Sequence, residues 1–284
     1  MNGKQLTWEA AVLRLKADKQ METLVSACYY DDPLTAAAER FAESEEWQAV
    51  CEILAAWLPG KGLDLGAGHG ISSYALARHG CQVTALEPDG SPVLGAEAIR
   101  RLARETDATI AVVQGQGETL PFGDASFDIV YGRQVLHHAA HLPGLCREVA
   151  RVLRPGGVFV ATREHVISEL SDLDAFLQTH PLHSLYGGEN AFLLKQYQQA
   201  IREAGLIIKE TYGPFDSVIN YFPLSKAEYQ EKIAGALSKV VGRGLAARIA
   251  GHTEVQRLAG RMRSWLSDDP GRLYSFVAVK SGIL

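Results

Sequence analysis

Several features that define special classes of protein are scarce or missing in these 284 residues. The four cysteines, Cys28, Cys51, Cys81 and Cys146, lie far apart and form no CxxC pair, so we expect free thiols and no disulfide framework. No apolar run approaches the length that crosses a bilayer, and residues 1–20 contain no continuous apolar segment of the kind found in secretory signals. The sequence therefore predicts a cytoplasmic protein without stable membrane insertion.

An excess of basic residues is also missing. The chain has 28 Lys and Arg against 33 Asp and Glu, which gives a formal net charge of -5. Sequence-independent binding to nucleic acid depends on a basic footprint that neutralises phosphates. We therefore expect no nucleic-acid partner.

What the chain does contain is a regular alternation of short apolar runs and helical segments. Apolar residues at helical spacing over residues 7–58 predict N-terminal helices, which end at Pro59-Gly60. Five short runs then have the character of strands buried on both faces: Gly62–Leu65, Val83–Leu86, Ile110–Val113, Phe127–Tyr131 and Val158–Ala161. Helical segments separate them: Ile71–His79, Pro92–Arg104 and Leu142–Leu153. This alternation predicts an α/β fold with a doubly wound, mostly parallel sheet.

The C-terminal part of the chain adds two strands and further helices. We expect a helix over Arg163–Tyr186, a second helix over Ala191–Ala204 capped by Asn190, and strands over Leu206–Tyr212 and Leu273–Val279. The sheet then has seven strands, the last of them antiparallel. About sixty residues separate the last two strands, too many for a structureless loop. The expected domains are an N-terminal helical lid over 1–58, an α/β core over 59–214 with 272–284, and an inserted helical cap over 215–271.

The predicted cap is rich in basic residues and has an apolar face at helical spacing. Its Lys and Arg residues are Lys226, Lys232, Lys239, Arg243, Arg248, Arg257, Arg261 and Arg263. Its apolar face consists of Ile233, Leu237, Val240, Ile249, Leu258 and Trp265. A solvated face over a buried apolar stripe accounts for this pattern. A surface for an anionic membrane or an acidic substrate is the alternative.

The most informative segment is the glycine loop Leu63–Gly70, which follows a strand and opens a helix. Glycines at such a place let the backbone turn sharply and point its amides at a ligand. The spacing is GxGxG, one residue shorter than the dinucleotide fingerprint GxGxxG. Asp64, two residues before the first glycine, would repel a pyrophosphate but attract an ammonium group. The loop therefore suits a nucleoside with a cationic tail better than one with phosphates.

Glu87 is the second element of this expected site. It ends the next strand, directly before Pro88 and some twenty residues after the loop. A carboxylate at that place can accept hydrogen bonds from both ribose hydroxyls.

Four segments in order resemble motifs of the class I S-adenosylmethionine-dependent methyltransferases. They are Leu63–Gly70, Gly115–Phe122, Ser126–His138 and Leu153–Gly157. The chain is most similar in character to the group that includes the ubiquinone and menaquinone C-methyltransferases. The resemblance implies a Rossmann-like methyltransferase fold and S-adenosylmethionine as the cofactor. It also implies a set of cofactor-binding residues: Gly66, Ala67, Gly68 and Gly70 in the loop, Gly117 and Glu118 at the adenine, and Gly132 and Arg133 at the exit of the fourth strand.

The resemblance further implies methyl transfer to an oxygen, nitrogen or carbon of a small-molecule acceptor. In related proteins an N-terminal segment covers the methionyl end of the cofactor, a position that Tyr30 and Arg40 would take here. Two alternatives are a dinucleotide-binding oxidoreductase and a non-catalytic S-adenosylmethionine-binding protein.

Candidate catalytic residues follow the fourth and fifth strands, at the edge where ligands bind in such sheets. His137 can serve as a general base, because histidine titrates near neutrality. Glu164, beside Arg163 and His165, can reach an acceptor, although ordinary polarity at a helix start explains it equally well. Adjacent histidines point in different directions and no carboxylate accompanies His137, His138 and His141 at ligand spacing, so we expect no metal site. The acceptor is expected to border His180–Asn190 and Pro214–Tyr221.

Overall fold

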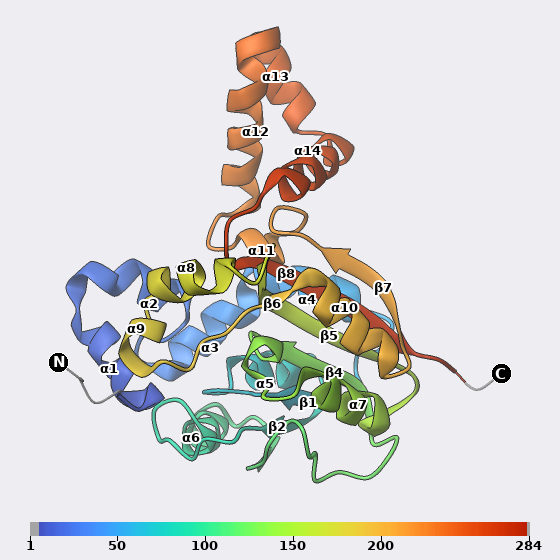
Figure 1. The fold of residues 1–284 in the computed structure, drawn as a ribbon. Helices are drawn as coiled ribbons and strands as arrows, with labels where there is room; N and C mark the ends of the chain where they lie inside the picture. The colour runs from blue at the N-terminus through green and yellow to red at the C-terminus, as the bar shows by residue number, and fades with distance from the viewer. Residues whose placement is uncertain (1–5, 283–284) are drawn as a thin grey trace.

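A twisted sheet with helices on both faces forms the body of the protein, and a helical arm projects from it (Figure 1). The computed structural model describes residues 6–282, so residues 1–5 of the expected lid and 283–284 of the expected core lie outside it. The strand order is β3-β2-β1-β4-β5-β8-β7, and the two-residue β6 pairs with β5. The strands are β1 Lys61–Leu65, β2 Gln82–Leu86, β3 Ile110–Val113, β4 Phe127–Arg133, β5 Leu153–Ile167, β6 Phe192–Leu193, β7 Leu206–Tyr212 and β8 Arg272–Lys280. Within residues 6–282, β8 pairs antiparallel with β5 and β7 and the other strand pairs are parallel, which confirms the predicted α/β class.

The sheet is apolar on both faces because helices cover both of them. Along β4, Ile129 and Tyr131 belong to one buried cluster and Val130, between them, belongs to another. This alternation follows from the two-residue period of a strand. The first cluster includes residues of α3, α4 and α5, whereas the second includes residues of α7 and α10. Trp47 of α4 illustrates the packing, since it is fully buried with its ring edge-on to Tyr131.

Helices precede, separate and follow the strands in the predicted order. Their bounds up to β5 are α1 Trp8–Ala17, η1 Lys19–Met21, α2 Glu22–Ala27, α3 Leu34–Glu43, α4 Glu45–Leu54, α5 Ile71–Arg78, α6 Ala96–Thr106, η2 Leu136–His138 and α7 Leu142–Val152. Capping residues in the sequence mark the start of several of these helices. Ser44, for example, caps α4 by accepting a hydrogen bond from the Trp47 amide at 3.0 Å.

One helix prediction after the fifth strand is wrong, and another has the wrong start and cap. No helix spans Arg163–Tyr186, because β5 continues to Ile167 and pairs there with β8 and β6. Only α8 Asp172–Thr179 and the short α9 His183–Tyr186 form within this stretch. The next helix, α10 Leu194–Glu203, begins later than predicted and is capped at Leu193 rather than at Asn190. The Leu193 amide donates to the Gln196 side chain, which replaces the expected asparagine cap.

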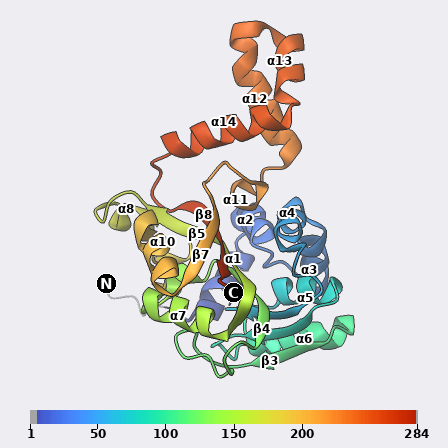
Figure 2. The same ribbon diagram turned by 90° about the vertical axis from the view of Figure 1, so that its right-hand side faces the viewer.

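The helices between β7 and β8 form an arm that projects from the body (Figures 1 and 2). They are α11 Val218–Tyr221, α12 Lys226–Val241, α13 Arg243–Ala250 and α14 Thr253–Leu266. Tyr229, Ile233 and Ala250 pack together within it. The predicted buried stripe is nevertheless wrong for Val240 and Trp265, which are 84% and 83% exposed. Within residues 6–282, no helix combines the length and apolar character needed to cross a bilayer.

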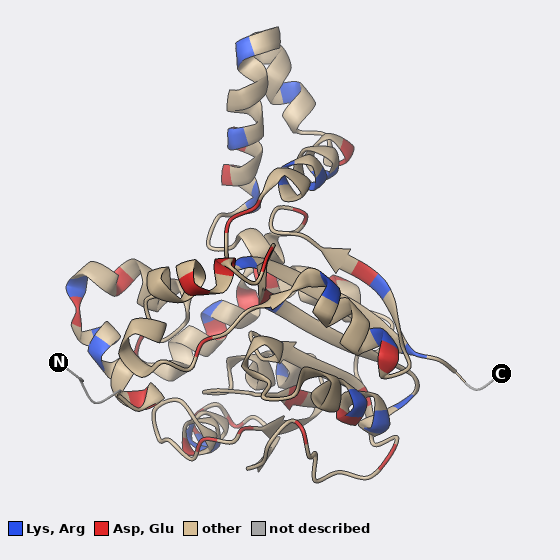
Figure 3. Cartoon of the chain, in the orientation of Figure 1, with Lys and Arg blue, Asp and Glu red and all other residues tan. Residues whose placement is uncertain are grey.

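Basic residues are distributed along the arm (Figure 3). The segment 226–266 holds eight Lys and Arg against three Glu, in a chain whose net charge is -5. A cavity at the carboxyl ends of β1, β2, β3 and β4 is lined, within residues 6–282, by no residue of α12–α14. The arm therefore does not lie over that cavity. The domain boundaries 1–58, 59–214 with 272–284, and 215–271 stay predictions.

Candidate functional site

The candidate site is a cavity of about 500 Å³ at the carboxyl ends of the central parallel strands. Its floor consists of the segments that follow β1, β2, β3 and β4. Its cover comes from α1, α2 and the chain around α9. Ligands bind at this edge of an open α/β sheet because the loops at the switch of strand order leave a crevice there. Most of the predicted cofactor residues line it: Tyr30, Asp64, Gly66, Ala67, Gly68, Glu87, Pro88, Gly117, Glu118 and Arg133.

The glycine loop turns as its sequence predicts. Gly66, Gly68 and Gly70 have φ angles of +61°, +55° and +92°, a region that other residues adopt at a cost. A Cβ on Gly66 would lie 2.8 Å from a methyl group of Val135, so close packing also requires glycine there. Gly70 caps α5 and packs against Ile99, outside the cavity lining.

We predict that Gly66→Ala destabilises the protein more than Gly156→Ala does. Gly156 has a φ of +78° with no atom within 4 Å of an added Cβ, so its replacement meets the left-handed backbone cost alone, about 1–2 kcal/mol. The Gly66 substitution meets a similar cost and also displaces Val135. Urea unfolding of both variants measures the difference. Equal free energies of unfolding would contradict the packing argument.

Two buried carboxylates face the cavity from the ends of β1 and β2. Glu87 accepts hydrogen bonds from the amides of Gly68 at 2.8 Å and Asp89 at 3.0 Å, and it holds the glycine loop against β2. Asp64 accepts one from the Ser73 hydroxyl at 2.6 Å. Burial raises the pKa of each carboxyl to about 7. Both carboxyl groups can therefore accept hydrogen bonds from a ligand or pair with a positively charged group on it.

The segment after β3 lies close to the loop, as the resemblance implies. Gly117 has no room for a side chain, since a Cβ would lie 3.0 Å from Leu145. Glu118 accepts hydrogen bonds from the amides of Ala140 at 2.9 Å and His141 at 3.4 Å. Its carboxylate thus ties this segment to the start of α7.

Arg133, at the end of β4, is held by a buried ion pair. Its guanidinium donates to both oxygens of Glu46, at 2.7 and 3.2 Å, and Glu46 is fully buried. Arg40 takes a different partner. It forms a two-point contact with Asp31, at 2.6 and 2.8 Å, and it does not line the cavity. Its predicted role at the methionyl carboxylate therefore depends on a rearrangement that the structure does not show.

His137 lines the same cavity, and its ring is fixed by Glu164. The Nδ1 atom of His137 is 2.7 Å from a Glu164 oxygen. Glu164 also accepts hydrogen bonds from the amides of Val135, Leu136 and His137. It is fully buried and does not line the cavity, and neither does Gly132. The structure therefore makes Glu164 a positioning residue for His137 rather than a group that touches the acceptor.

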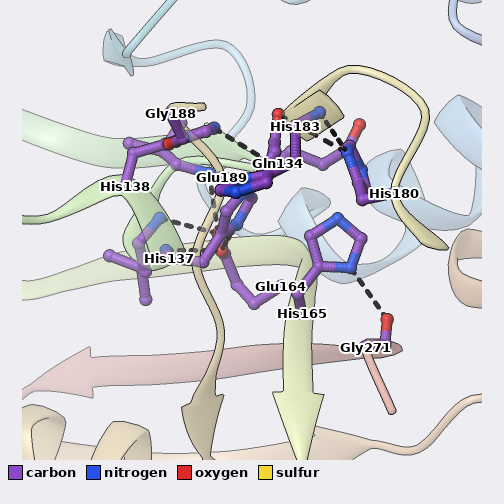
Figure 4. A network of polar contacts seen from close by, with 12 residues as sticks. Gln134, His137, His138, Glu164, His165, His180, His183, Gly188, Glu189 and Gly271 are labelled. Atoms are coloured by element: carbon purple, nitrogen blue, oxygen red, sulfur yellow. Dashed lines mark hydrogen bonds and ion pairs between the residues drawn. The ribbon is translucent and has the colours of Figure 1, made fainter. Parts of the chain in front are cut away.

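Further side chains converge on His137 from distant parts of the chain (Figure 4). Glu189, in the loop before β6, lies 3.6 Å from His137 Nε2. Tyr186 donates a hydrogen bond to the other oxygen of Glu189 at 2.6 Å. His165, near the end of β5, packs edge-on to His137 with ring centroids 4.8 Å apart. The sequence placed Glu164 and His165 at this edge, but it did not show that Glu189 completes the group.

This environment changes the expected behaviour of His137. Burial opposes its positive charge, but the hydrogen bond with Glu164 and the nearby negative charge of Glu189 outweigh that effect and raise its pKa to about 9. His165 and His138 lack such compensation, so burial lowers their pKa values to about 3 and about 4. An imidazole that keeps its proton at neutral pH is a poor acceptor of another. The role of His137 as a general base stays a prediction, and this arrangement does not favour it.

The two predicted acceptor borders have different outcomes. From the segment 180–190, the cavity is lined by His180, Pro181, Leu182, Tyr186 and Glu189. Pro214–Tyr221 instead lines a separate hollow beside α14 and the start of β8. The cover also includes Trp8, Leu15 and Leu24, whose only signal in the sequence was ordinary helical spacing.

Comparisons with known proteins relate this chain to methyltransferases. A family model described as a methyltransferase domain matches residues 63–161. Sterol 24-C-methyltransferase of Eremothecium gossypii is 29% identical over 216 residues, which cover 70% of this chain and 56% of that protein. Demethylmenaquinone methyltransferase of Tropheryma whipplei is 35% identical over 42% of this chain and 48% of that protein. The chain thus spans about half the length of these curated relatives.

A solved structure shows the same fold over most of the chain. A putative sarcosine dimethylglycine methyltransferase from Galdieria sulphuraria superposes with a TM-score of 0.56 at 23% identity. The match covers 90% of this chain and 91% of that one. At this identity the likeness concerns the fold alone.

Proposed function

Because the chain belongs to the class I S-adenosylmethionine-dependent methyltransferase superfamily, we propose that it transfers the methyl group of S-adenosylmethionine to an oxygen, nitrogen or carbon of a small molecule. One observation carries the proposal. The glycine loop, Glu87 and His137 line a single cavity, so a bound cofactor and an acceptor can meet there.

In this proposal the adenosine binds along the glycine loop, with the ribose hydroxyls at Glu87 and the adenine near Gly117 and Glu118. The positively charged methionyl end lies toward Asp64 and Tyr30. The acceptor lies against the imidazole ring of His137, whose position is set by Glu164. Methyl transfer is an in-line displacement, so holding the acceptor and the methyl carbon in line lowers the barrier. The small-molecule acceptor is the proposed partner.

An oxidoreductase that uses a dinucleotide is not favoured by the charges in this cavity. Asp64, Glu87, Asp89, Glu118 and Glu189 all line it. Among the described lining residues Arg133 is the one Lys or Arg, and its guanidinium is engaged by Glu46. A pyrophosphate would therefore meet carboxylates rather than donors with a positive charge. A non-catalytic binder remains the second alternative, and measured turnover would exclude it.

Methyl-labelled S-adenosylmethionine tests the proposed reaction. We suggest a panel of acceptors containing a sterol, a demethylmenaquinone and dimethylglycine, chosen from the names of the similar proteins. Label transferred to any of them supports the proposal. S-adenosylmethionine that binds but is never turned over, across these and broader metabolite extracts, would instead favour the non-catalytic binder.

We predict that His137→Ala lowers turnover at least about tenfold and leaves the affinity for S-adenosylhomocysteine within about twofold. His137 lies at the acceptor side, so its loss should affect the transfer step more than cofactor binding. Steady-state kinetics and calorimetry measure the two quantities separately. His252→Ala is the matched control, since His252 is an exposed histidine of the arm. A variant with full turnover would remove His137 from the site.

A further inference from the structure

We propose that His137, His165 and Glu189 bind a divalent transition metal ion, such as Zn²⁺, at the acceptor side of the cavity. The inference rests on the proposed function for the ion's role but not for its binding. The three residues come from η2, from the end of β5 and from the loop before β6, and the fold brings them together (Figure 4). All three are buried, and their ligand atoms lie within 4.8 Å of one another.

The distance between His137 and Glu189 suits a metal with little movement, whereas His165 has farther to move, since the ligand atoms of the group lie within 4.8 Å of one another. Zn²⁺ binds imidazole nitrogen and carboxylate oxygen at about 2.0–2.2 Å, so neighbouring ligand atoms in a tetrahedral site lie about 3.3 Å apart. His137 Nε2 and the nearer Glu189 oxygen are 3.6 Å apart, beyond the range of a good hydrogen bond. An ion between them would draw both atoms in by a few tenths of an ångström.

His165 supplies an independent indication. Its Nδ1 lies 2.8 Å from the carbonyl oxygen of Gly271, which can only accept, so Nδ1 carries the proton and Nε2 has a free lone pair. Yet Nε2 is buried without a hydrogen-bond partner in the described part of the chain, and the residue is only 8% exposed. A buried, unpaired acceptor carries a free-energy cost. A metal ion in the cluster would remove it.

The surroundings of the cluster match those of metal-binding histidines. Such histidines almost always donate the second ring N–H to a carboxylate or a backbone carbonyl, which fixes the ring and its tautomer. His137 has Glu164 in that position and His165 has the Gly271 carbonyl. Glu189 is in turn fixed by the Tyr186 hydroxyl at 2.6 Å. Each of the three proposed ligands is thus held from behind, and the ion would displace the proton of His137 Nε2 when it binds.

Three protein ligands leave at least one coordination position for another molecule. His137 and Glu189 both line the large cavity, so this position opens toward the acceptor. We infer that the acceptor binds the ion through the oxygen atom of a hydroxyl or enol group. The bound O–H releases its proton to solvent, and the oxygen attacks the methyl carbon. The C–S bond breaks and its electron pair stays on sulfur, which becomes a neutral thioether.

Untagged protein, stripped with a chelator and exchanged into metal-free buffer, provides the direct test. Titration with Zn²⁺ should show one equivalent bound per chain, and Mg²⁺, which prefers oxygen ligands, should show none. His165→Ala and Glu189→Gln should each weaken Zn²⁺ binding at least about 100-fold. His252→Ala, in the exposed part of the arm, should bind as the unaltered chain does. Unfolding curves confirm that each variant is folded.

Co²⁺ adds a spectroscopic signature that activity does not influence. Visible absorption bands from Co²⁺ with nitrogen and oxygen ligands should develop with one equivalent and disappear in His165→Ala. Absence of Zn²⁺ uptake, or uptake that His165→Ala and Glu189→Gln leave unchanged, would overturn the proposal. S-adenosylhomocysteine binding measured on the same preparation separates the two ideas. Its presence without metal uptake removes only the metal site, and metal uptake without it removes only the proposed function.

Discussion

Replacing Glu87 with Ala is expected to weaken S-adenosylhomocysteine binding by about 10- to 100-fold, a loss of about 1–3 kcal/mol. The carboxylate is positioned to accept the ribose hydroxyls, and it also holds the loop amide of Gly68 at 2.8 Å. Both contributions disappear in the variant. Isothermal titration calorimetry measures the change. Glu97→Ala is the control, since that glutamate pairs with Arg100 on the exposed side of α6.

The pH dependence of binding gives a second readout for Glu87. Burial raises its pKa to about 7, and only the ionised form accepts both hydroxyl protons. Affinity in the unaltered protein should therefore fall as the pH drops below about 7. Asp64 titrates in the same range and contributes to the fall, so the variant should show a shallower dependence. Unchanged affinity in Glu87→Ala would refute the ribose assignment.

Replacing Glu46 with Ala is expected to lower the free energy of unfolding by about 3–5 kcal/mol. The substitution leaves the Arg133 guanidinium in the interior without its partner, over the rings of Tyr29 and Phe41. Denaturant unfolding measures the loss. Glu43→Ala is the matched control, because Glu43 is exposed and lies 3.8 Å from Arg78 at the surface.

A double variant separates the lost ion pair from the lost packing around it. Glu46→Leu with Arg133→Met replaces both charges with apolar groups and should recover most of the stability. The double variant should nevertheless bind the cofactor more weakly than the unaltered protein does, because it lacks Arg133, which lines the cavity. If Glu46→Ala unfolds at the same denaturant concentration as Glu43→Ala, the buried pair does not have the importance assigned to it.

Local patterns predicted the sheet and the cofactor side of the site. The strands from Gly62 to Arg133 are short and largely apolar, and helices separate most of the strands up to Ala161, so their period and order were evident from the sequence. The glycine loop was evident for a similar reason. The positive φ angles at Gly66, Gly68 and Gly70 favour glycine at each position, so the glycines in the sequence already indicate the turn.

The acceptor side depended on contacts that no local pattern encodes. Arg163, Glu164 and His165 are polar, which suggested the start of a helix, yet they continue β5 because β8 pairs with Glu164 and His165 from more than 100 residues away. A bulge between Ala161 and Glu164, with Arg163 at a φ of +62°, precedes the turn of Glu164 toward His137. Glu189 joins the same group from the loop after α9. Only the folded chain brings these side chains within reach of one another.

Equilibrium binding of S-adenosylhomocysteine and NAD to the unaltered protein tests the central claim most directly. We expect one tight site for S-adenosylhomocysteine, formed by the glycine loop and Glu87, and no measurable binding of NAD. Saturable NAD binding together with no binding of S-adenosylhomocysteine would contradict it.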